Sequence, residues 1–559
     1  MMRTIFFASL FVATLACNWR PLRSVAENTV RRVNSWNGRT YHGNGTYTDL
    51  PREMVEKHVP QGESVCLIIK SENGDPASIE RSLHITLSWA MSPKPVEIRS
   101  RHDYEKTDAS FLVINKYSDF KPAGFEKIAE GPGQALWRRE GRESGDSAGM
   151  GNNRGGPPNP FREAAGAVFV CALIAFAVRR SKPAPAPEHD FSRQPALFSR
   201  LKTAWIPCVF FILAAAQALS HTFNAPTGLG VYGGKAKLFF LSGGIPAGFF
   251  TNPAYSTMQP AYPPGLTLLT LLSYAVSNSC GEWLTQLIPV FAAAVALWGL
   301  CHGARAVWAM LWILAAFLDR QVLIMSAYYY AEPFVALCIV LGWSRISGNG
   351  SDWRGWLLLG AAGLFKNEGL VIACAVSAAW ICCKPGGRMG GGPGGKNPRV
   401  PLLKICVCVI APTLAWHIAC RLAGATLYDY APVWQPDRAK FATAFAHILK
   451  TAFAEPWRYG FAYPLAVAGL LWRCFVRRKS QGASGRFASC FAPPLVAPLV
   501  APLICLPAFA YVYSLSLSPD FDWHLGSSAA RLLWAPSLLV LYESLTQSKR
   551  QGVFDSHSH

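Results

Sequence analysis

Ionisable side chains stand in short motifs inside otherwise apolar stretches of the chain. Glu332 lies in YAEP, Lys366 and Glu368 lie in KNEG, and His524 and Arg531 lie in DWHLGSSAARLL. Carboxylates and imidazoles can take a proton from a hydroxyl group, and lysine or arginine can stabilise negative charge on a leaving group. Because charges in an apolar interior are costly and usually functional, these residues are candidates for a functional site.

Two further motifs come earlier in the chain. TGLGVYGGKAKLFF holds Tyr232, Lys235 and Lys237, and QPAYPPGLTLL holds Tyr262. Lysines beside a glycine pair can approach an anionic substrate, but they can equally lie in the lipid headgroup region, where their stems stay in apolar surroundings. Both interpretations remain open for these lysines.

The other motifs also have plain structural interpretations. Glu332 can simply begin a helix, because acids and proline are favoured in a first turn. Lys366 and Glu368 can form a mutual ion pair. His524 can be a solvated loop residue, and Arg531 can be an interfacial anchor.

The composition indicates a membrane protein. Hydrophobic residues make up 51% of the 559 residues and charged residues 15%, with a formal net charge of +20. A soluble domain has ~25% charged residues, and high apolar content excludes intrinsic disorder. The basic clusters follow apolar runs, as in cytoplasmic loops, and lack interleaved aromatic residues for base stacking. We therefore expect a polytopic membrane protein that does not bind nucleic acid.

Apolar runs that approach the ~20 residues of a membrane span recur along the chain. We place them near 164–178, 204–220, 263–278, 284–303, 306–318, 322–343, 356–383, 402–420, 460–475, 488–514 and 529–545. The expected fold is mainly α, a polytopic transmembrane helix bundle of about 11 spans plus an N-terminal signal anchor, with a small extracytoplasmic α/β domain.

Basic clusters set the expected orientation of these spans. The clusters mark cytoplasmic segments at 179–203, 345–354, 384–404 and 473–487. The segments then expected outside are 19–162, 221–262, 421–458 and 515–528. The expected divisions are a signal peptide or signal anchor, an α/β domain, a flexible linker, the transmembrane domain and a tail, at 1–18, 19–144, 145–163, 164–550 and 551–559.

The segment before the linker has the pattern of a small α/β domain. Its expected strands are ESVCLIIKS, KPVEIRS and DASFLVINK, and EKIAEGPGQALWRRE is expected to form a closing hairpin through its Gly-Pro-Gly turn. IERSLHITLSWAM is expected to be a helix. The 16 cysteines of the chain show no CxxC pair or Cys/His metal spacing, so we expect neither a zinc site nor a disulfide framework.

The stretch 356–383 needs a special interpretation. Both of its ends are expected in the cytoplasm, yet it is too short for two full crossings. Two short helices that fold back at Lys366–Gly369 would satisfy both ends. Non-helical backbone at that depth is tolerated only when it is buried in protein or lines a wet cavity. The charge pattern therefore predicts a polar cavity that holds Lys366 and Glu368.

The order of the motifs resembles a known family. VYGGKAK, AYPPGL, YAEP, KNEG and DFDWHLGSSAARLLWAP follow one another in the chain. This order is similar to that of the GT-C superfamily of polytopic sugar transferases, the group that includes protein mannosyltransferase-like and RgtA/B/C/D-like proteins. The resemblance covers roughly residues 204–545 and leaves out the N-terminal domain.

The resemblance implies a reaction and a set of partners. The donor would be a polyprenyl-phosphate sugar held by membrane lipid, and the acceptor a cell-envelope glycan, lipid or protein. Transfer would proceed with inversion. It would take place at the outer face of a membrane, which we expect to be the bacterial inner membrane. No cofactor is expected, and a divalent metal is possible but not expected.

The resemblance also implies roles for particular residues. The expected proton acceptors and other catalytic residues are Glu332, Asp522 and His524. The expected ligands of the donor phosphate are Lys366, Arg531, Lys235 and Lys237. The expected substrate-binding residues are Thr227, Tyr232, Tyr262, Glu368 and Trp523.

One position departs from the family pattern. Thr227 stands where the family has a loop carboxylate that is thought to act as base or to orient the acceptor hydroxyl, and a threonine cannot take a proton at neutral pH. Another acid such as Glu332 or Asp522 can serve, the acceptor can already be anionic, or the chain can be catalytically weak or dead. The rival hypotheses are therefore a non-catalytic relative that binds lipid-linked sugar, and a lipid or sugar transporter whose broken helix lines the path.

Overall fold

The computed structural model describes the greater part of the chain after residue 159 and short segments before it. The described residues are 8–14, 65–69, 96–100, 111–115, 125–131, 134–139, 160–180, 197–219, 227–252, 255, 258–280, 284–301, 307–348, 352–383, 403, 405–425, 435–481, 496–517 and 521–555.

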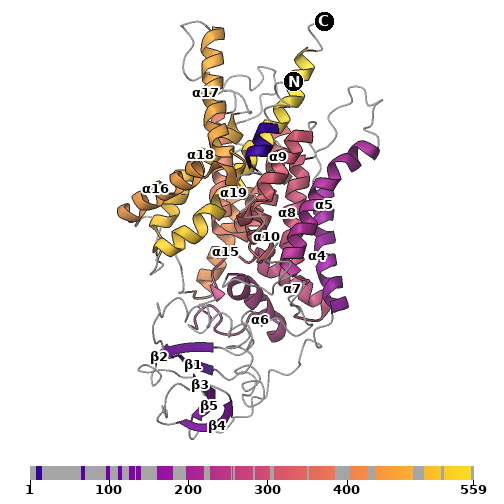
Figure 1. The fold of residues 1–559 in the computed structure, drawn as a ribbon. Coiled ribbons are helices and arrows are strands. Elements are labelled where there is room, and N and C mark those ends of the chain that lie inside the picture. The colour runs from indigo at the N-terminus through magenta and orange to yellow at the C-terminus, as the bar shows by residue number, and fades with distance from the viewer. Residues whose placement is uncertain are drawn as a thin grey trace.

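The part of the chain after residue 159 is mainly helical. Its elements are α4 (Pro160–Arg180), α5 (Leu197–Leu219), η2 (Thr227–Gly234), α6 (Lys235–Ser242), α7 (Gly265–Ser277), α8 (Leu287–Cys301), α9 (Val307–Phe317), α10 (Arg320–Ala327), α11 (Glu332–Gly348), α12 (Trp353–Phe365), α13 (Asn367–Cys383), η4 (Ile405–Ile410), α15 (Ala411–Leu422), α16 (Arg438–Ala454), η5 (Pro456–Tyr459), α17 (Ala462–Gln481), α18 (Ala497–Ser514) and α19 (Phe521–Asp555). The long helices stand side by side as a bundle, whereas α16 lies across them (Figure 1).

Five strands form one mixed sheet with the order β2-β1-β3-β5-β4. The strands are β1 (Val65–Ile69), β2 (Val96–Ser100), β3 (Phe111–Asn115), β4 (Phe125–Gly131) and β5 (Gln134–Arg139). β1 pairs in parallel with β2 and β3, and β5 pairs antiparallel with β3 and β4. All the expected strands and the closing hairpin are confirmed, and the helix expected at 79–91 lies outside the described residues.

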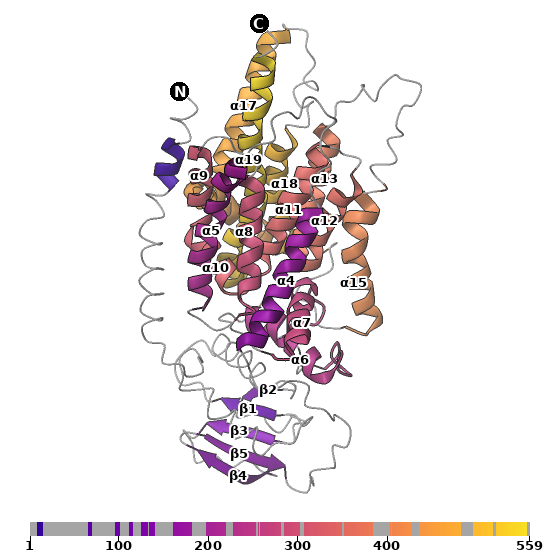
Figure 2. The same cartoon turned by 90° about the vertical axis from the view of Figure 1, so that its right-hand side faces the viewer.

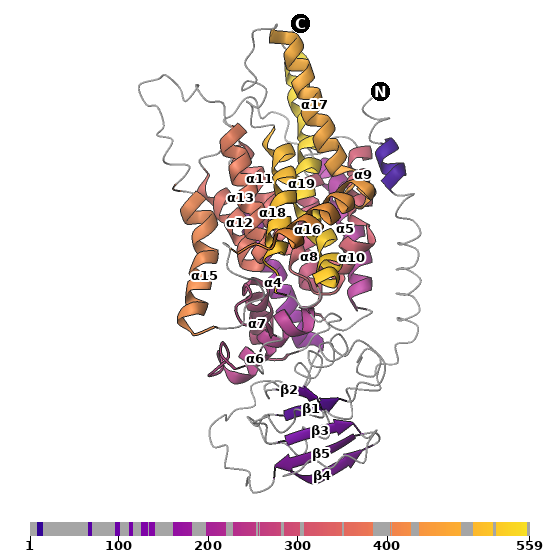
Figure 3. The same ribbon diagram turned by 90° about the vertical axis from the view of Figure 1, so that its left-hand side faces the viewer.

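The sheet lies at the end of the bundle where α6 and α7 lie (Figures 2 and 3). The carboxyl-terminal parts of α17 and α19 project from the opposite end (Figures 1 and 3). The short helix at residues 8–14 belongs to the expected signal anchor, and its Leu10 and Phe11 pack against the main core. The bundle thus has two distinct ends, one covered by the sheet and one marked by the basic tails of two helices.

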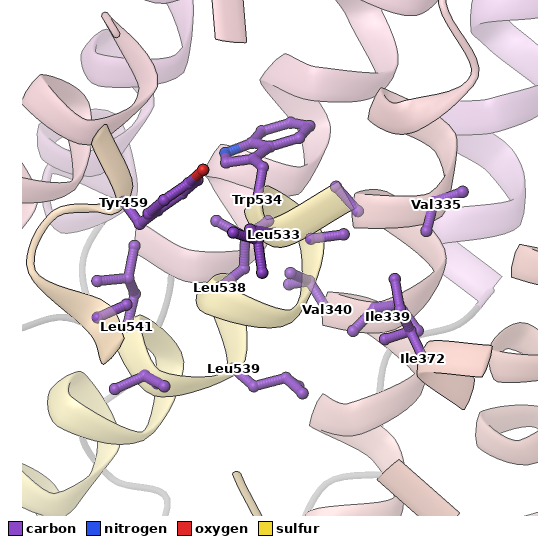
Figure 4. Close-up of a cluster of buried hydrophobic side chains, with 14 of the residues drawn as sticks. Val335, Ile339, Val340, Ile372, Tyr459, Leu533, Trp534, Leu538, Leu539 and Leu541 are labelled. Atoms are coloured by element: carbon purple, nitrogen blue, oxygen red, sulfur yellow. The ribbon is translucent and has the colours of Figure 1, made fainter. Parts of the chain in front are cut away.

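The core of the bundle forms where the central helices bury their apolar faces. α11, α13 and α19 meet around Ile339, Ile372 and Leu533, whose side chains point into one cluster (Figure 4). Trp534 lies in the same cluster, and its ring meets that of Phe317 edge to face at 5.4 Å between centroids. Large rings that interlock in this way fix the spacing of the helices, because close-packed interiors tolerate few voids.

The helix reversal expected in 356–383 is confirmed. α12 ends at Phe365 and α13 begins at Asn367, and only Lys366 between them has extended backbone, with φ −158° and ψ 139°. Trp356 near the start of α12 and Trp380 near the end of α13 pack edge to face with 5.2 Å between ring centroids. The two helices therefore run antiparallel as a hairpin whose tip carries Lys366.

The expected count of about 11 membrane spans is not supported. Two helices are long and apolar enough to cross a membrane, Ile405–Leu422 and Ala497–Ser514, and α9 with α10 makes a third if this pair, bent by 62°, is one span. The other apolar helical segments among the described residues, which include Ala164–Val178 within α4 and Trp205–Leu219 within α5, have 10–17 residues. Seventeen residues rise only about 26 Å, which falls short of a ~30 Å hydrocarbon core.

Several expected boundaries are also corrected. The span expected at 322–343 is broken between α10 and α11. The outer loop expected at 421–458 contains α16, because Asp437 caps its first turn by accepting from the Ala439 and Lys440 amides at 2.8 and 3.1 Å. α4 already begins at Pro160 inside the expected linker, and α19 begins at Phe521 inside the outer loop expected at 515–528 and continues into the expected tail.

Replacement of Gly369 by alanine is expected to open the hairpin. A Cβ atom at Gly369 would lie 2.2 Å from the carbonyl oxygen of Ala362, and backbone cannot yield as a flexible side chain can. Overpacking of this kind costs about 1–3 kcal/mol, so the purified protein in detergent should melt several degrees lower. Gly526→Ala is the matched control, because no atom of the described residues, apart from its chain neighbours and its own helix backbone, lies within 4 Å of the new Cβ. Equal melting temperatures for the two variants would contradict this close approach.

Candidate functional site

The tip of the α12–α13 hairpin carries a buried lysine. The Lys366 amide still donates to the Ala362 carbonyl at 3.1 Å, and its own carbonyl accepts from the Gly369 amide at 2.8 Å. These two bonds satisfy the backbone at the break. The Lys366 side chain, 7% exposed, turns into the bundle rather than toward solvent.

Glu332 joins this lysine to a second cation. The first residue of α11 is Glu332, and its Oε1 accepts from Lys366 Nζ at 2.9 Å and lies 3.3 Å from a terminal guanidinium nitrogen of Arg531 on α19. The Glu332 side chain is 4% exposed and that of Arg531 13%. One carboxylate oxygen thus holds together three elements that lie far apart in the sequence.

Glu368 lies beside this pair with one oxygen unused. Its Oε1 is 4.0 Å from Lys366 Nζ, which is too long for a hydrogen bond. Its Oε2 is buried and has no hydrogen-bond partner among the described residues. A buried polar atom without a partner costs about 1–3 kcal/mol, so a group that donates a hydrogen bond there would be bound favourably.

Arg531 is held from two further sides. Its Nε donates to the Ser527 carbonyl at 3.0 Å, one turn earlier in α19. Its guanidinium lies 4.5 Å from the centre of the Tyr330 ring, within the range of a cation–π contact. These two contacts hold the guanidinium beside Glu332.

A strained residue positions Tyr330 and Glu332. Tyr329 has φ 65°, a left-handed conformation that is rare for a bulky residue. Its hydroxyl is 2.5 Å from the Thr270 hydroxyl, and its side chain is fully buried. Because packing holds this residue in place, the chain turns sharply between α10 and α11 and presents Tyr330 and Glu332 to Arg531.

The KAK motif lies next to the site rather than in it. η2 precedes α6, and Lys235 at the start of α6 is buried, with its Nζ donating to the carbonyl oxygens of Gln259 and Tyr262 at 3.1 and 3.4 Å. The Tyr232 side chain is hydrogen-bonded to Tyr262 and interacts electrostatically with Glu332. Tyr232 therefore connects this layer to the buried charges.

The start of η2 approaches the same turn. A Cβ atom at Gly228 would lie 2.8 Å from the carbonyl oxygen of Tyr328, so only glycine permits this approach. Thr227 immediately precedes Gly228 and begins η2. The loop position that the family resemblance singles out is thus next to the turn that carries Tyr329 and Tyr330.

The remaining residues that the sequence predicted lie outside the cluster of Lys366, Glu332 and Arg531. Lys237 is half-buried on α6, and Asp522 is exposed in the first turn of α19. His524 Nδ1 is 3.0 Å from the Ser516 hydroxyl, and its ring packs on Tyr513 with 5.5 Å between centroids. Trp523 lies in the first turn of α19.

Tyr513 and Ser528 were not predicted from the sequence. The Tyr513 hydroxyl is 2.5 Å from the Ser528 hydroxyl, which donates to the His524 carbonyl at 2.6 Å. Tyr513 also interacts electrostatically with Glu368 and Arg531. α18 carries no motif around Tyr513, so nothing in the sequence distinguishes this tyrosine from a packing residue.

The site contains no cluster of metal ligands. Within the described segments, no group of three or more His, Cys, Asp or Glu side chains gathers in a way that could hold a metal ion. The described charges are instead two carboxylates and two cations, which balance one another. The arrangement can bind an anion through Lys366 and Arg531, and it can accept a hydrogen bond at Glu368.

Comparison of the chain with family models, with curated proteins and with solved structures gave no match.

Removal of the shared carboxylate is expected to destabilise the protein strongly. Glu332→Gln leaves Lys366 and Arg531 buried without their partner, which costs about 3–5 kcal/mol. Glu455→Gln is the control, because its ion pair with Arg458 is 38–41% exposed and such surface pairs contribute about 0–1 kcal/mol. Thermal unfolding of both variants in detergent measures the difference. A Glu332→Gln protein as stable as the control would exclude this structural role of the ion cluster.

Proposed function

We propose that this chain is an integral membrane glycosyltransferase of GT-C type. It would transfer a sugar from a polyprenyl-phosphate donor to an extracytoplasmic acceptor with inversion. The observation that carries the proposal is the buried cluster of Lys366, Glu332 and Arg531 at a helix break. These residues come from separate parts of the chain, and three motifs that resemble the family supply them: YAEP, KNEG and DFDWHLGSSAARLLWAP.

The surface of the bundle supports a membrane setting. Large apolar side chains stand exposed on helices around it, among them Phe176 on α4, Ile212 on α5, Val407 on η4, Ile418 on α15 and Trp472 on α17. Exposed apolar surface on this scale marks contact with lipid or partners. The further helices beyond the two long ones would then cross or enter the membrane as short, tilted or paired segments.

The two ends of the bundle support the orientation. The basic end of α17, with Arg477 and Arg478, projects from the end opposite the sheet (Figure 1). Positive residues favour the cytoplasmic side, so the end with the sheet, η2 and α6 would face outward. The site would then lie towards a donor and an acceptor at the outer face of a bacterial inner membrane.

The charges of the site suit the expected leaving group. When the bond from the anomeric carbon to the phosphate oxygen breaks, the lipid phosphate gains negative charge, which preorganised cations stabilise. Lys366 and Arg531 are already fixed in place by Glu332, so they need little reorganisation. Lys235 and Lys237 on α6 would attract the phosphate group on its approach, and Tyr232 and Tyr262 would pack against the sugar.

The Thr227 position supports a second candidate, a non-catalytic protein that binds lipid-linked sugar. Thr227 begins η2 beside the turn that carries Tyr329 and Tyr330, and its hydroxyl cannot act as a base at neutral pH. A protein of this kind would bind the donor without transfer. Replacement by aspartate would then create activity that the native chain lacks.

Loss of Lys366 is expected to abolish transfer. The native protein, Lys366→Ala and the control Lys450→Ala are incubated with radiolabelled polyprenyl-phosphate hexoses and pentoses and a crude envelope extract. Because Lys366 would stabilise the leaving phosphate, its loss should lower the rate by at least about 100-fold. Lys450 is exposed on α16, and its replacement should leave the rate nearly unchanged. Equal rates in the two variants would contradict the proposed role of Lys366.

Thr227→Asp distinguishes the two candidates. If the native chain is a transferase, it transfers sugar without this change, and a second carboxylate near the site alters the rate only moderately. If the chain is a non-catalytic binder, the native protein retains donor on a filter but transfers none. Transfer that occurs only in Thr227→Asp would then replace the enzyme proposal with the binder.

A further inference from the structure

We propose that Glu368, rather than Glu332, takes the proton from the acceptor hydroxyl. This assignment rests on the transferase function proposed above. It concerns the two carboxylates of the site, which have similar burial but opposite hydrogen-bond states. Glu332 is 3% exposed and Glu368 is 5% exposed.

Glu332 is already committed to two cations. Its Oε1 holds both Lys366 Nζ and a terminal nitrogen of Arg531. A proton on this carboxylate would remove its charge and leave two buried cations without their counter-ion, which is strongly unfavourable. Glu332 is therefore suited to positioning the cations and poorly suited to accepting a proton during turnover.

Glu368 differs from Glu332 in its hydrogen bonding. Its Oε2 is buried without a hydrogen-bond partner among the described residues, and its Oε1 has only the 4.0 Å approach of Lys366. A hydroxyl group that donates to Oε2 would satisfy this atom and would place its proton on the path to the carboxylate. Good geometry between base and hydroxyl is the first requirement for general-base catalysis.

The position of Glu368 also answers the departure at Thr227. Glu368 stands in the first turn of α13, two residues after the Lys366 that would hold the leaving phosphate. The carboxylate and the cation are thus fixed to one rigid hairpin tip. A base at this tip makes a loop carboxylate in η2 unnecessary, which reconciles Thr227 with an active enzyme.

The proposed step balances in atoms and electrons. The acceptor oxygen forms a bond to the anomeric carbon, and the bond between that carbon and the phosphate oxygen breaks. The electron pair of the broken bond leaves with the lipid phosphate, whose charge Lys366 and Arg531 stabilise. The hydroxyl proton moves to Glu368 Oε2 and returns to water after the product leaves.

The test compares Glu368→Gln, Glu368→Asp and the exposed control Glu455→Gln in the transfer assay. Loss of a general base lowers the rate by about 100- to 10,000-fold, so the rate of Glu368→Gln should fall by this factor, with unchanged donor retention on a filter. Glu368→Asp keeps a carboxylate at this position and should recover part of the rate. Melting temperatures of all variants show whether each one is folded.

The results that would overturn the assignment are distinguishable from failure of the transferase function. If the native protein transfers sugar and a folded Glu368→Gln protein keeps the native rate, Glu368 is not the base, while the transferase function stands. If Glu368→Gln does not fold, a folded Glu368→Asp protein with the full native rate has the same consequence. If the native protein transfers from no donor, the transferase function fails, and the role of Glu368 fails with it.

Discussion

The structure depends on one carboxylate oxygen that two cations share. Glu332 Oε1 binds Lys366 at 2.9 Å and lies 3.3 Å from Arg531, all three side chains being withdrawn from solvent. Burial of any one of these charges alone would be prohibitive, whereas the set is tolerable because each charge meets its counter-ion in good geometry. The break between α12 and α13, the start of α11 and the third turn of α19 must therefore come together in the folded protein, or none of them can place its charge in the interior.

The rest of the bundle is arranged to make this meeting possible. The α12–α13 hairpin places Lys366, at its tip, in the interior of the bundle, while Trp356 and Trp380 pack together at its other end. The left-handed Tyr329 turns the chain so that α11 begins with Glu332 at the site. Strain of this kind persists only where surrounding contacts over-determine it, and the short contact of Tyr329 with Thr270 is one of them.

The two carboxylates of the site divide the work between structure and chemistry. Glu332 neutralises and aims the cations, which is the preorganisation that electrostatic catalysis needs. Glu368 keeps an oxygen without a partner among the described residues, and a hydroxyl group that donates a hydrogen bond to this oxygen would be bound favourably. A site with cations and an available carboxylate on one rigid tip suits the transfer of a group from a phosphate to a hydroxyl.

The sequence by itself determined features that depend on local pattern. Short apolar runs bounded by polar residues identified strands such as VCLII and FLVIN. A charged KNEG in the middle of an apolar stretch with basic ends identified the hairpin and its tip. The motifs also pointed to Glu332, Lys366, Glu368 and Arg531.

The pairing of these charged residues, however, was decided only by the tertiary structure. Ion-pair partners in separate helices are set by long-range packing, which leaves no periodic trace in the sequence. For the same reason the sequence offered an ion pair of Lys366 with Glu368 only as one alternative, whereas in the fold Lys366 Nζ lies 2.9 Å from Glu332 and 4.0 Å from Glu368. Helix lengths were likewise decided by tertiary contacts, since apolar runs continue through breaks such as Tyr329 that packing imposes.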